Sequence, residues 1–194
     1  MMWMEKLGSM VRGRWLRSAR ERWNDGYRRG KWEGLKDREE EPRLDAVVRM
    51  LRKYCPQARI LEIGCGEALL QRRLAPNDFS RLVGIDLSDV VIEQAQKFAS
   101  PNVTYLTDDM RSYQPTETFD AILFTESINY VRHRDEVLRH YLPHLEPEGV
   151  FIVSVFDQIR SPQIWQEVAA VLQTVETVIT ENDRGKWTCK VLRP

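Results

Sequence analysis

The sequence predicts an α/β fold: a seven-stranded, mostly parallel β-sheet with one antiparallel strand and with helices on both faces. The chain has 194 residues, which is enough to bury one hydrophobic core. From about Pro42 onward, short apolar runs alternate with segments of helical periodicity, a pattern typical of parallel strands joined by helices. The last two strand-like segments, 171–180 and 186–192, are separated by too few residues for a helix, so we expect them to pair antiparallel.

The elements before that hairpin follow from apolar spacing and from turn residues. Apolar residues recur at helical spacing from Leu44 to Leu51, and Pro42 is suitably placed in the first turn of that helix. Ser88 is expected to cap the helix that follows the second strand. Strands are expected at 59–63, 81–85, 103–106, 119–124 and 149–156, and helices between them at 69–74, 88–98 and 135–145.

Residues 1–41 differ in composition from residues 42–194, and we interpret them as an N-terminal helical leader to the sheet domain. The leader holds four of the six tryptophans, many arginines and few β-branched residues. Trp23, Tyr27 and Trp32 are suited to a lid over a half-buried ligand, or equally to packing. A solvated amphipathic helix is our first interpretation of the basic side chains; contact with RNA, with an acidic partner or with a membrane surface are the alternatives.

The overall composition excludes several classes of protein. The formal net charge is zero, which argues against broad electrostatic attraction to nucleic acid or to anionic membranes. Three widely spaced cysteines form neither a disulfide framework nor a zinc-binding pattern, and we expect no metal site. There is no signal-peptide core and no apolar stretch of about 20 residues, so we expect a cytoplasmic protein without a membrane segment. The oligomeric state is left open.

A glycine-containing turn follows the first predicted strand. In an open parallel sheet, ligands bind beyond the carboxyl ends of the strands. Gly64 and Gly66 permit a tight turn and a close approach of the backbone to a ligand. Leu69 stands where the dinucleotide fingerprint requires its third glycine, so a nicotinamide cofactor is disfavoured.

Acidic residues follow the second and third predicted strands. Asp86 comes twenty residues after Gly66, and a carboxylate at this point accepts hydrogen bonds from ribose hydroxyls. Asp108 and Asp109 come after the third strand, and an acid here is suited to an adenine amino group, with Met110 over the ring. We expect one of these two acids to be only solvated.

Five segments, in this order, resemble the motifs of class I S-adenosylmethionine-dependent methyltransferases over roughly residues 42–194. They are ILEIGCG, VGIDLS, the acidic pair 108–109, FDAILFTESINYV and LEPEGVFIVSV. The resemblance implies a Rossmann-like class I methyltransferase fold, S-adenosylmethionine as cofactor with S-adenosylhomocysteine as product, and methyl transfer. It also implies residue roles: methionine-part binding by Gly64 and Gly66, ribose binding by Asp86, adenine contacts from Leu87, Asp109 and Met110, and a border to the transferred methyl formed by Glu126 to Tyr130.

Four further residues are cofactor-binding candidates. Glu62, Cys65 and Thr125 stand within or beside the motifs, and Arg43 is a candidate for the cofactor carboxylate or for an anionic acceptor. Ala68 departs from the family, because it stands at the last glycine of the usual Gly-x-Gly-x-Gly loop. We expect binding to survive this change unless residue 68 needs a positive φ.

The leader, from Trp23 to Glu33, is similar to that of a bacterial subgroup of small-molecule methyltransferases. We therefore expect methyl transfer to an oxygen or a nitrogen of a small acceptor such as a metabolite or sugar. The alternatives are a protein or RNA methyltransferase and a regulatory protein that binds the cofactor without turnover. The catalytic candidates are Glu126, Tyr130 and His133, and the acceptor-binding candidates are Tyr27, Trp32 and Asn129. A purely structural role is the alternative for Glu126, Asn129 and Tyr130, and solvation for His133.

Overall fold

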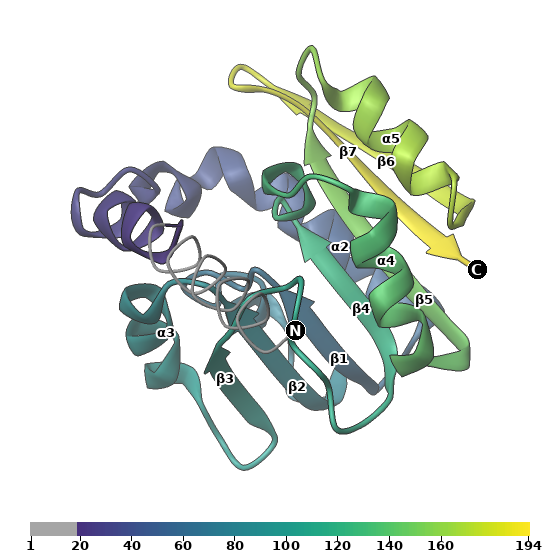
Figure 1. The fold of residues 1–194 in the computed structure, drawn as a ribbon, viewed down its shortest axis with the longest axis horizontal. Helices are drawn as coiled ribbons and strands as arrows, with labels where there is room; N and C mark the ends of the chain where they lie inside the picture. The colour runs from purple at the N-terminus through teal and green to yellow at the C-terminus, as the bar shows by residue number, and fades with distance from the viewer. Residues whose placement is uncertain (1–18) are drawn as a thin grey trace, which may run out of the picture.

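A computed structural model, which describes residues 19–194, has the predicted sheet. Its strand order is β3-β2-β1-β4-β5-β7-β6 (Figure 1). All neighbouring strands are parallel except those that pair with β7, which is antiparallel to both β5 and β6. The strands are β1 (Ala58–Ile63), β2 (Phe79–Asp86), β3 (Val103–Thr107), β4 (Phe119–Thr125), β5 (Leu145–Phe156), β6 (Gln173–Asn182) and β7 (Gly185–Arg193).

Helices cover both faces of this sheet, as predicted. The α-helices are α2 (Glu41–Tyr54), α3 (Asp89–Ala95), α4 (Arg134–Tyr141) and α5 (Ser161–Ala169), and the described part of the leader begins with a helix at 19–28. Short 3-10 helices lie at Glu33–Lys36, Arg38–Glu40, Gln71–Arg73, Gln96–Phe98, Ile128–Tyr130 and Leu142–His144. In Figure 1, α4 and α5 lie in front of the sheet and α2 lies behind it.

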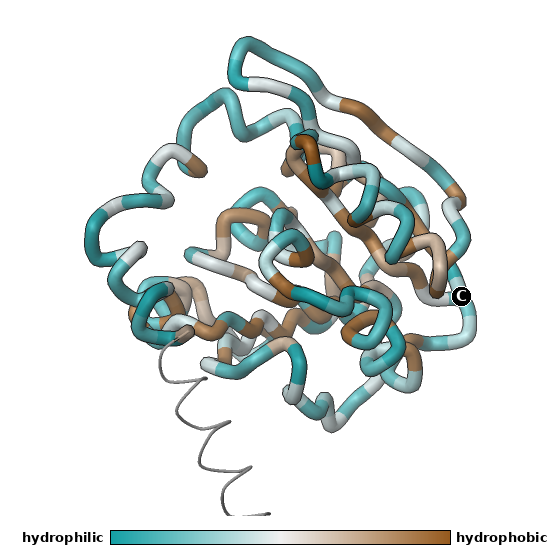
Figure 2. Tube along the Cα trace, turned by 45° about the horizontal axis from the view of Figure 1, so that its top comes forward, coloured by the Kyte–Doolittle hydropathy of each residue, from teal (hydrophilic) through white to brown (hydrophobic). Residues whose placement is uncertain are grey.

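Two hydrophobic cores, one on each face, follow from the alternation of side chains along the strands. Ile60 of β1 belongs to the core under α2, whereas its neighbour Leu61 belongs to the core under α4 and α5. Both side chains are fully buried, which is why the strand is a mostly apolar run. Figure 2 shows the hydrophobic segments gathered in the middle of the molecule and hydrophilic segments along its outer loops.

The structure differs from the prediction at two elements. The helix expected at 69–74 is a series of turns followed by the 3-10 helix Gln71–Arg73. Gly66 and Ala68 both have left-handed backbone conformations, and such residues interrupt an α-helix at its start. Helix α5 was not predicted, although Pro162 in its first turn and the spacing of Ile164 and Val168, both buried, are signals of a helix.

The other boundaries agree closely with prediction. Ser88 caps α3, because its hydroxyl accepts a hydrogen bond from the Val91 amide at 3.3 Å. The helix expected at 135–145 is α4 followed by a 3-10 turn, and β5 begins earlier than expected, at Leu145. The first sheet-domain helix begins at Glu41, next to the predicted boundary, and the division into leader and domain stays a prediction. Within the described residues, no helix combines the length and the apolar character that a membrane crossing requires.

Candidate active site

A cavity of about 1090 Å³ lies at the carboxyl ends of β1, β2 and β4, where the leader crosses them. In Figure 1, the helices of the leader lie on this side of the sheet. The structure brings every site residue proposed from the sequence to the wall of this one cavity: Tyr27, Trp32, Arg43, Glu62, Gly64, Cys65, Gly66, Asp86, Leu87, Asp109, Met110, Thr125, Glu126, Asn129, Tyr130 and His133.

The turn after β1 is tightly fixed to its neighbours. The amides of Gly64 and Cys65 both donate to the carbonyl oxygen of Ile85 on β2, at 2.7 and 3.0 Å. Gly64 has φ +75°, and a Cβ added to it would lie 2.5 Å from the Cβ of Ser127. Gly66 has φ +53°, and the nearest atom to an added Cβ would be the hydroxyl of Tyr27, at 3.5 Å. Gly64 is therefore required both for its backbone conformation and for its lack of a side chain.

Ala68 has φ +60° and is completely buried. This is the condition under which the sequence analysis expected the missing glycine to matter. Alanine in the left-handed region costs about 1–2 kcal/mol relative to the right-handed region. The loop therefore carries a modest backbone strain that a glycine would not have.

Substitutions at residue 68 test this strain. We expect Ala68→Gly to change the free energy of unfolding by less than about 1 kcal/mol, because relief of strain is offset by loss of one buried methyl group. Ala68→Val should destabilise the protein by about 2 kcal/mol or more, since a β-branched residue fits neither the conformation nor the packed site. Urea unfolding of both variants measures the two effects. A valine variant as stable as the wild type would contradict the assigned conformation.

Asp86 is held at the end of β2 by backbone amides. Its carboxylate accepts hydrogen bonds from Gly66 at 3.1 Å and from Ser88 at 2.9 Å. Burial raises its pKa to about 6, and these amides act in the opposite direction. The hydroxyl of Ser88 donates to the side chain of the buried Asn24, at 2.7 Å, which joins the leader to this strand end.

Glu62 is a buried acid without a full set of hydrogen-bond partners. It is 2% exposed, and among the described residues its Oε2 has no donor. Burial raises its pKa to about 8, although the charge of Arg43 acts to lower it. An unpartnered carboxylate oxygen in the wall of a cavity favours a ligand that carries an N–H or ammonium donor.

The raised pKa of Glu62 predicts how stability depends on pH. Between pH 4.5 and about 8 the folded chain keeps a proton that the unfolded chain releases, so the free energy of unfolding falls as the pH rises through this window. We expect Glu62→Gln to flatten this fall. At pH 8.5 the variant should exceed the wild type by at least about 1.4 kcal/mol, the value of one pKa unit. Urea unfolding at pH 5, 7 and 8.5 is the measurement, and parallel pH curves for the two proteins would contradict the assignment.

Asp109 has a partner that the sequence analysis did not identify. The guanidinium of Arg111 bonds to both of its carboxylate oxygens, and the Arg111 amide donates to Oδ1 at 3.0 Å. Burial acts to raise the pKa of Asp109, but the hydrogen bonds from Arg111 outweigh it, so the pKa is lowered. The carboxylate is therefore ionised, and Arg111 occupies both of its oxygens. A contact between Asp109 and the adenine stays a prediction. Met110, the next residue, is fixed by the hydroxyl of Tyr141, which donates to its carbonyl oxygen at 2.8 Å.

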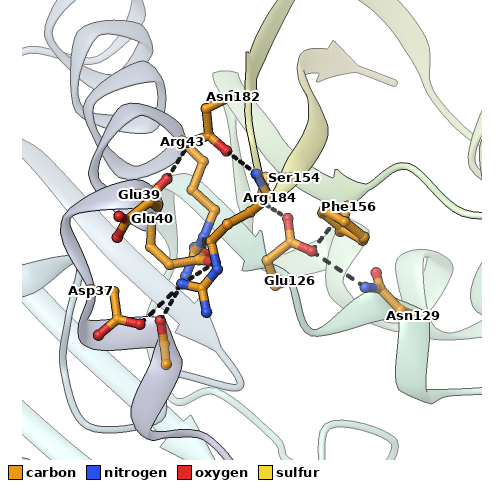
Figure 3. A network of polar contacts seen from close by, with 11 residues as sticks. Asp37, Glu39, Glu40, Arg43, Glu126, Asn129, Ser154, Phe156, Asn182 and Arg184 are labelled. Carbon is orange, nitrogen blue, oxygen red and sulfur yellow. Dashed lines mark hydrogen bonds and ion pairs between the residues drawn. The ribbon is translucent and has the colours of Figure 1, made fainter.

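The loop after β4 is organised around Glu126. This residue has φ +56°, and its two carboxylate oxygens accept hydrogen bonds from the hydroxyl of Ser154 at 2.6 Å and from the amide of Phe156 at 2.7 Å (Figure 3). The side-chain amide of Asn129 lies 3.5 Å from the same carboxylate. Burial raises the pKa of Glu126. Its carboxylate therefore ties the end of β4 to β5, a structural role that the sequence analysis left open beside acceptor contact.

Arg134 fixes the same loop from outside and was not anticipated. Its guanidinium donates to the carbonyl oxygens of Ile128 at 3.0 Å and of Asn129 at 3.2 Å, and it pairs with Glu167 of α5 at 3.0 Å. His133, the residue before it, is exposed and has φ +53° at the start of α4. The left-handed conformation turns the chain from the loop into the helix.

Aromatic side chains from the leader and from the β4 loop meet at the cavity. Trp23 stacks on Trp32 with ring centroids 5.4 Å apart, and Tyr130 packs edge-on against Trp23 at 4.8 Å. Tyr27 lies 6.4 Å from Trp32, and burial together with the charge of Asp86 raises its pKa. Tyr130 keeps 54% of its surface exposed. These four rings form one wall of the cavity, the place that the sequence analysis proposed for a lid.

Other contacts close the cavity without any signal in the sequence. Lys36 of the leader pairs with Glu67 of the glycine turn at 2.7 Å. Arg184, in the β6–β7 turn, bonds to the carbonyl oxygen of Gly34 at 2.7 Å. Each joins residues far apart in the chain, so neither spacing nor periodicity reveals them. Among residues 19–194, no group of three or more His, Cys, Asp or Glu side chains is placed to hold a metal ion.

The chain is similar in sequence to known methyltransferases. Residues 60–149 match a family model described as "Methyltransferase domain". Trans-aconitate 2-methyltransferase of Escherichia coli O9:H4 (strain HS) is 31% identical over 133 residues, which cover 66% of this chain and 48% of that protein. Ubiquinone biosynthesis O-methyltransferase of Rickettsia canadensis (strain McKiel) is 23% identical over 63% of this chain and 54% of that protein. This chain therefore spans about half the length of these relatives.

Solved structures share the fold. The N-methyltransferase NodS from Bradyrhizobium japonicum WM9, in complex with S-adenosyl-L-homocysteine, matches with a TM-score of 0.74 at 20% identity, over 84% of this chain and 90% of that one. Magnesium protoporphyrin IX methyltransferase (ChlM) from Synechocystis PCC 6803, with S-adenosylmethionine bound, matches with a TM-score of 0.73 at 17% identity, over 92% and 97%. The sheet order, the motifs and these likenesses agree: the chain has the Rossmann-like fold of class I S-adenosylmethionine-dependent methyltransferases.

Proposed function

We propose that this protein binds S-adenosylmethionine and transfers its methyl group to an oxygen or a nitrogen of a small molecule. The observation that carries the proposal is the hydrogen bond between the Gly66 amide and the Asp86 carboxylate, in the wall of a single cavity. It joins the glycine turn after β1 to the acid after β2. These are the two groups that the motifs assign to opposite ends of one cofactor.

The wall of the cavity offers matching partners for each part of this cofactor. Glu62, whose Oε2 lacks a donor, suits the ammonium group, and the guanidinium of Arg43 suits the carboxylate. Asp86 suits the ribose hydroxyls, and Leu87 and Met110 supply apolar surface for the adenine. When bound, S-adenosylmethionine supplies the activated methyl group as a sulfonium.

We propose that the chain itself contributes mainly position. Alignment of two reactants lowers a barrier by about 7–11 kcal/mol. The aromatic wall of Trp23, Trp32 and Tyr130 would hold the acceptor against the cofactor and exclude water. If the acceptor must lose a proton, Tyr130 and His133 remain candidates beside Glu126. Both oxygens of Glu126 already accept hydrogen bonds, so we favour an indirect role for it, through the orientation of Asn129.

A small acceptor is favoured over a macromolecule by the leader, whose side chains line a cavity of about 1090 Å³ together with the strand ends. The names of the relatives point the same way, since they refer to trans-aconitate and to ubiquinone biosynthesis. A protein or RNA methyltransferase and a regulatory binding protein remain the alternatives. A cytoplasmic location and the lack of a nucleic-acid partner stay predictions.

The test is turnover. The purified chain is incubated with S-adenosylmethionine and a panel of metabolites, sugars, amines and phenols, and release of S-adenosylhomocysteine is measured. The proposal predicts release that depends on one class of small acceptor. Release only with RNA or protein would support the macromolecular alternative, and cofactor binding without release from any acceptor would support the regulatory one.

A further inference from the structure

Arg43 is a buried cation that uses only part of its hydrogen-bonding capacity within the protein. Its side chain is 3% exposed, and its Nε donates to Glu40 at 2.5 Å. Its two terminal nitrogens have no partner among residues 19–194, although the residue lines the cavity. Buried guanidinium groups are normally fully bonded, so these nitrogens favour an anionic group of a ligand.

The acids on the cavity side of Arg43 do not fill this role. Arg43 lies close enough to Glu62 and Glu126 to lower the pKa of each, but neither carboxylate bonds to it. Burial raises the pKa of both acids nevertheless, and that of Glu62 reaches about 8. Without a ligand, Glu62 is therefore largely protonated at neutral pH, and the charge of Arg43 is compensated mainly by Glu40.

Glu40 is shared between two arginines. Its side chain is 8% exposed; one oxygen takes the Nε of Arg43 and the other lies 3.5 Å from Nη1 of Arg184 (Figure 3). Arg184 comes from the β6–β7 turn, and its Nη1 also bonds to Gly34 at 2.7 Å and lies 3.3 Å from Asp37. Arg184 thus holds Glu40 in place, and Glu40 fixes the direction of the Arg43 guanidinium.

From this arrangement we propose that Glu40 and Arg184 are positioning residues for the cofactor. They hold the terminal nitrogens of Arg43 toward the cavity, where these bind the carboxylate of the methionine part. A turn at the far edge of the sheet thereby sets the affinity for that part of the cofactor alone. The inference rests on the proposed function, because it requires S-adenosylmethionine or its product as ligand.

The test compares two probes that differ by the amino-acid part. S-adenosylhomocysteine carries the carboxylate, and 5′-methylthioadenosine has the same adenosine and thioether without it. Calorimetry is carried out with the full chain and with Arg184→Ala, which is the first choice because this side chain is 37% exposed. We expect its affinity for S-adenosylhomocysteine to fall by about tenfold, a usual scale for coupled neighbours, with affinity for 5′-methylthioadenosine unchanged within about twofold.

Further variants separate positioning from a merely structural role. Arg184→Lys should recover part of the loss, and Glu40→Gln should reproduce it. In an Arg43→Ala background, Arg184→Ala should have no further effect on either probe, because the residue through which it acts is gone. Arg193→Ala is the matched control: Arg193 lies on β7, the strand that follows the same turn, its side chain is 42% exposed, and it pairs with Glu148 at 4.0 Å outside the wall of the cavity. It should leave the ratio of the two affinities unchanged.

The outcomes are distinct. Equal loss for both probes in Arg184→Ala, or no loss for either, would overturn the inference while leaving the proposed function intact. An equal change of the ratio of the two affinities in Arg193→Ala and Arg184→Ala would also overturn it. Failure of the unaltered protein to bind both probes would instead remove the proposed function. Thermal unfolding and circular dichroism of each variant exclude a loss of fold as the cause.

Discussion

Gly64→Ala is expected to lower the affinity for S-adenosylhomocysteine by about 100-fold and the free energy of unfolding by about 3 kcal/mol. An alanine at φ +75° is strained, and its Cβ would lie 2.5 Å from that of Ser127. Ser127 must then move, and its hydroxyl loses the bond to the carbonyl oxygen of Ile63 that joins the β4 loop to β1. Calorimetric titration and urea unfolding measure the two effects.

Gly66→Ala is the matched control for this prediction. Its φ is +53°, but an added Cβ would meet no atom closer than 3.5 Å. Ala68 shows that the same turn accepts an alanine at φ +60°. We therefore expect Gly66→Ala to cost only the backbone strain, about 1 kcal/mol. Equal destabilisation by the two substitutions would show that the contact with Ser127 is not the cause.

Asp86→Ala is expected to reduce affinity for the same ligand by about 100-fold or more, with a smaller effect on stability. The carboxylate would hold the ribose, and it also fixes the amides of Gly66 and Ser88 around the binding site. Stability should change less, because the lost hydrogen bonds are partly offset by removal of an acid whose burial raises its pKa to about 6.

Asp89→Ala provides the comparison. Asp89 is an exposed acid in the first turn of α3, three residues beyond Asp86, and it does not line the cavity. Its removal changes the net charge by the same amount and should leave the affinity unchanged within about twofold, since exposed charges have small effects. Similar losses for both aspartates would point to long-range charge rather than to direct contact by Asp86.

The fold was predictable because its signals are local. Each central strand is buried on both faces, so β1 and β4 read as mostly apolar runs in the sequence. The cap of α3 follows from the type of one residue, Ser88. The antiparallel pairing of β6 with β7 follows from the short link between these strands. The turns after Gly66 were harder to predict. An alanine does not itself signal a left-handed conformation, and only the place of Ala68 at the last glycine of the family loop raised that possibility.

The positions of the site residues were predictable for a topological reason. Parallel strands bring their carboxyl ends to one edge, so residues that follow β1, β2 and β4 must meet there. Their partners were not predictable. Three contacts illustrate this: Arg111 with Asp109, Ser154 with Glu126, and Arg184 with Glu40. They depend on how segments pack together or on the direction of a side chain, and the spacing of residues in the sequence does not encode either.

The central claim is that the turn at Gly64–Gly66 and the carboxylate of Asp86 form one cofactor site, and calorimetric titration of the wild-type chain with S-adenosylhomocysteine tests it most directly. The account predicts saturable binding of one molecule per chain, in the micromolar range or tighter, and abolished or strongly weakened binding in Asp86→Ala. A folded wild-type protein that binds neither S-adenosylhomocysteine nor S-adenosylmethionine would contradict it.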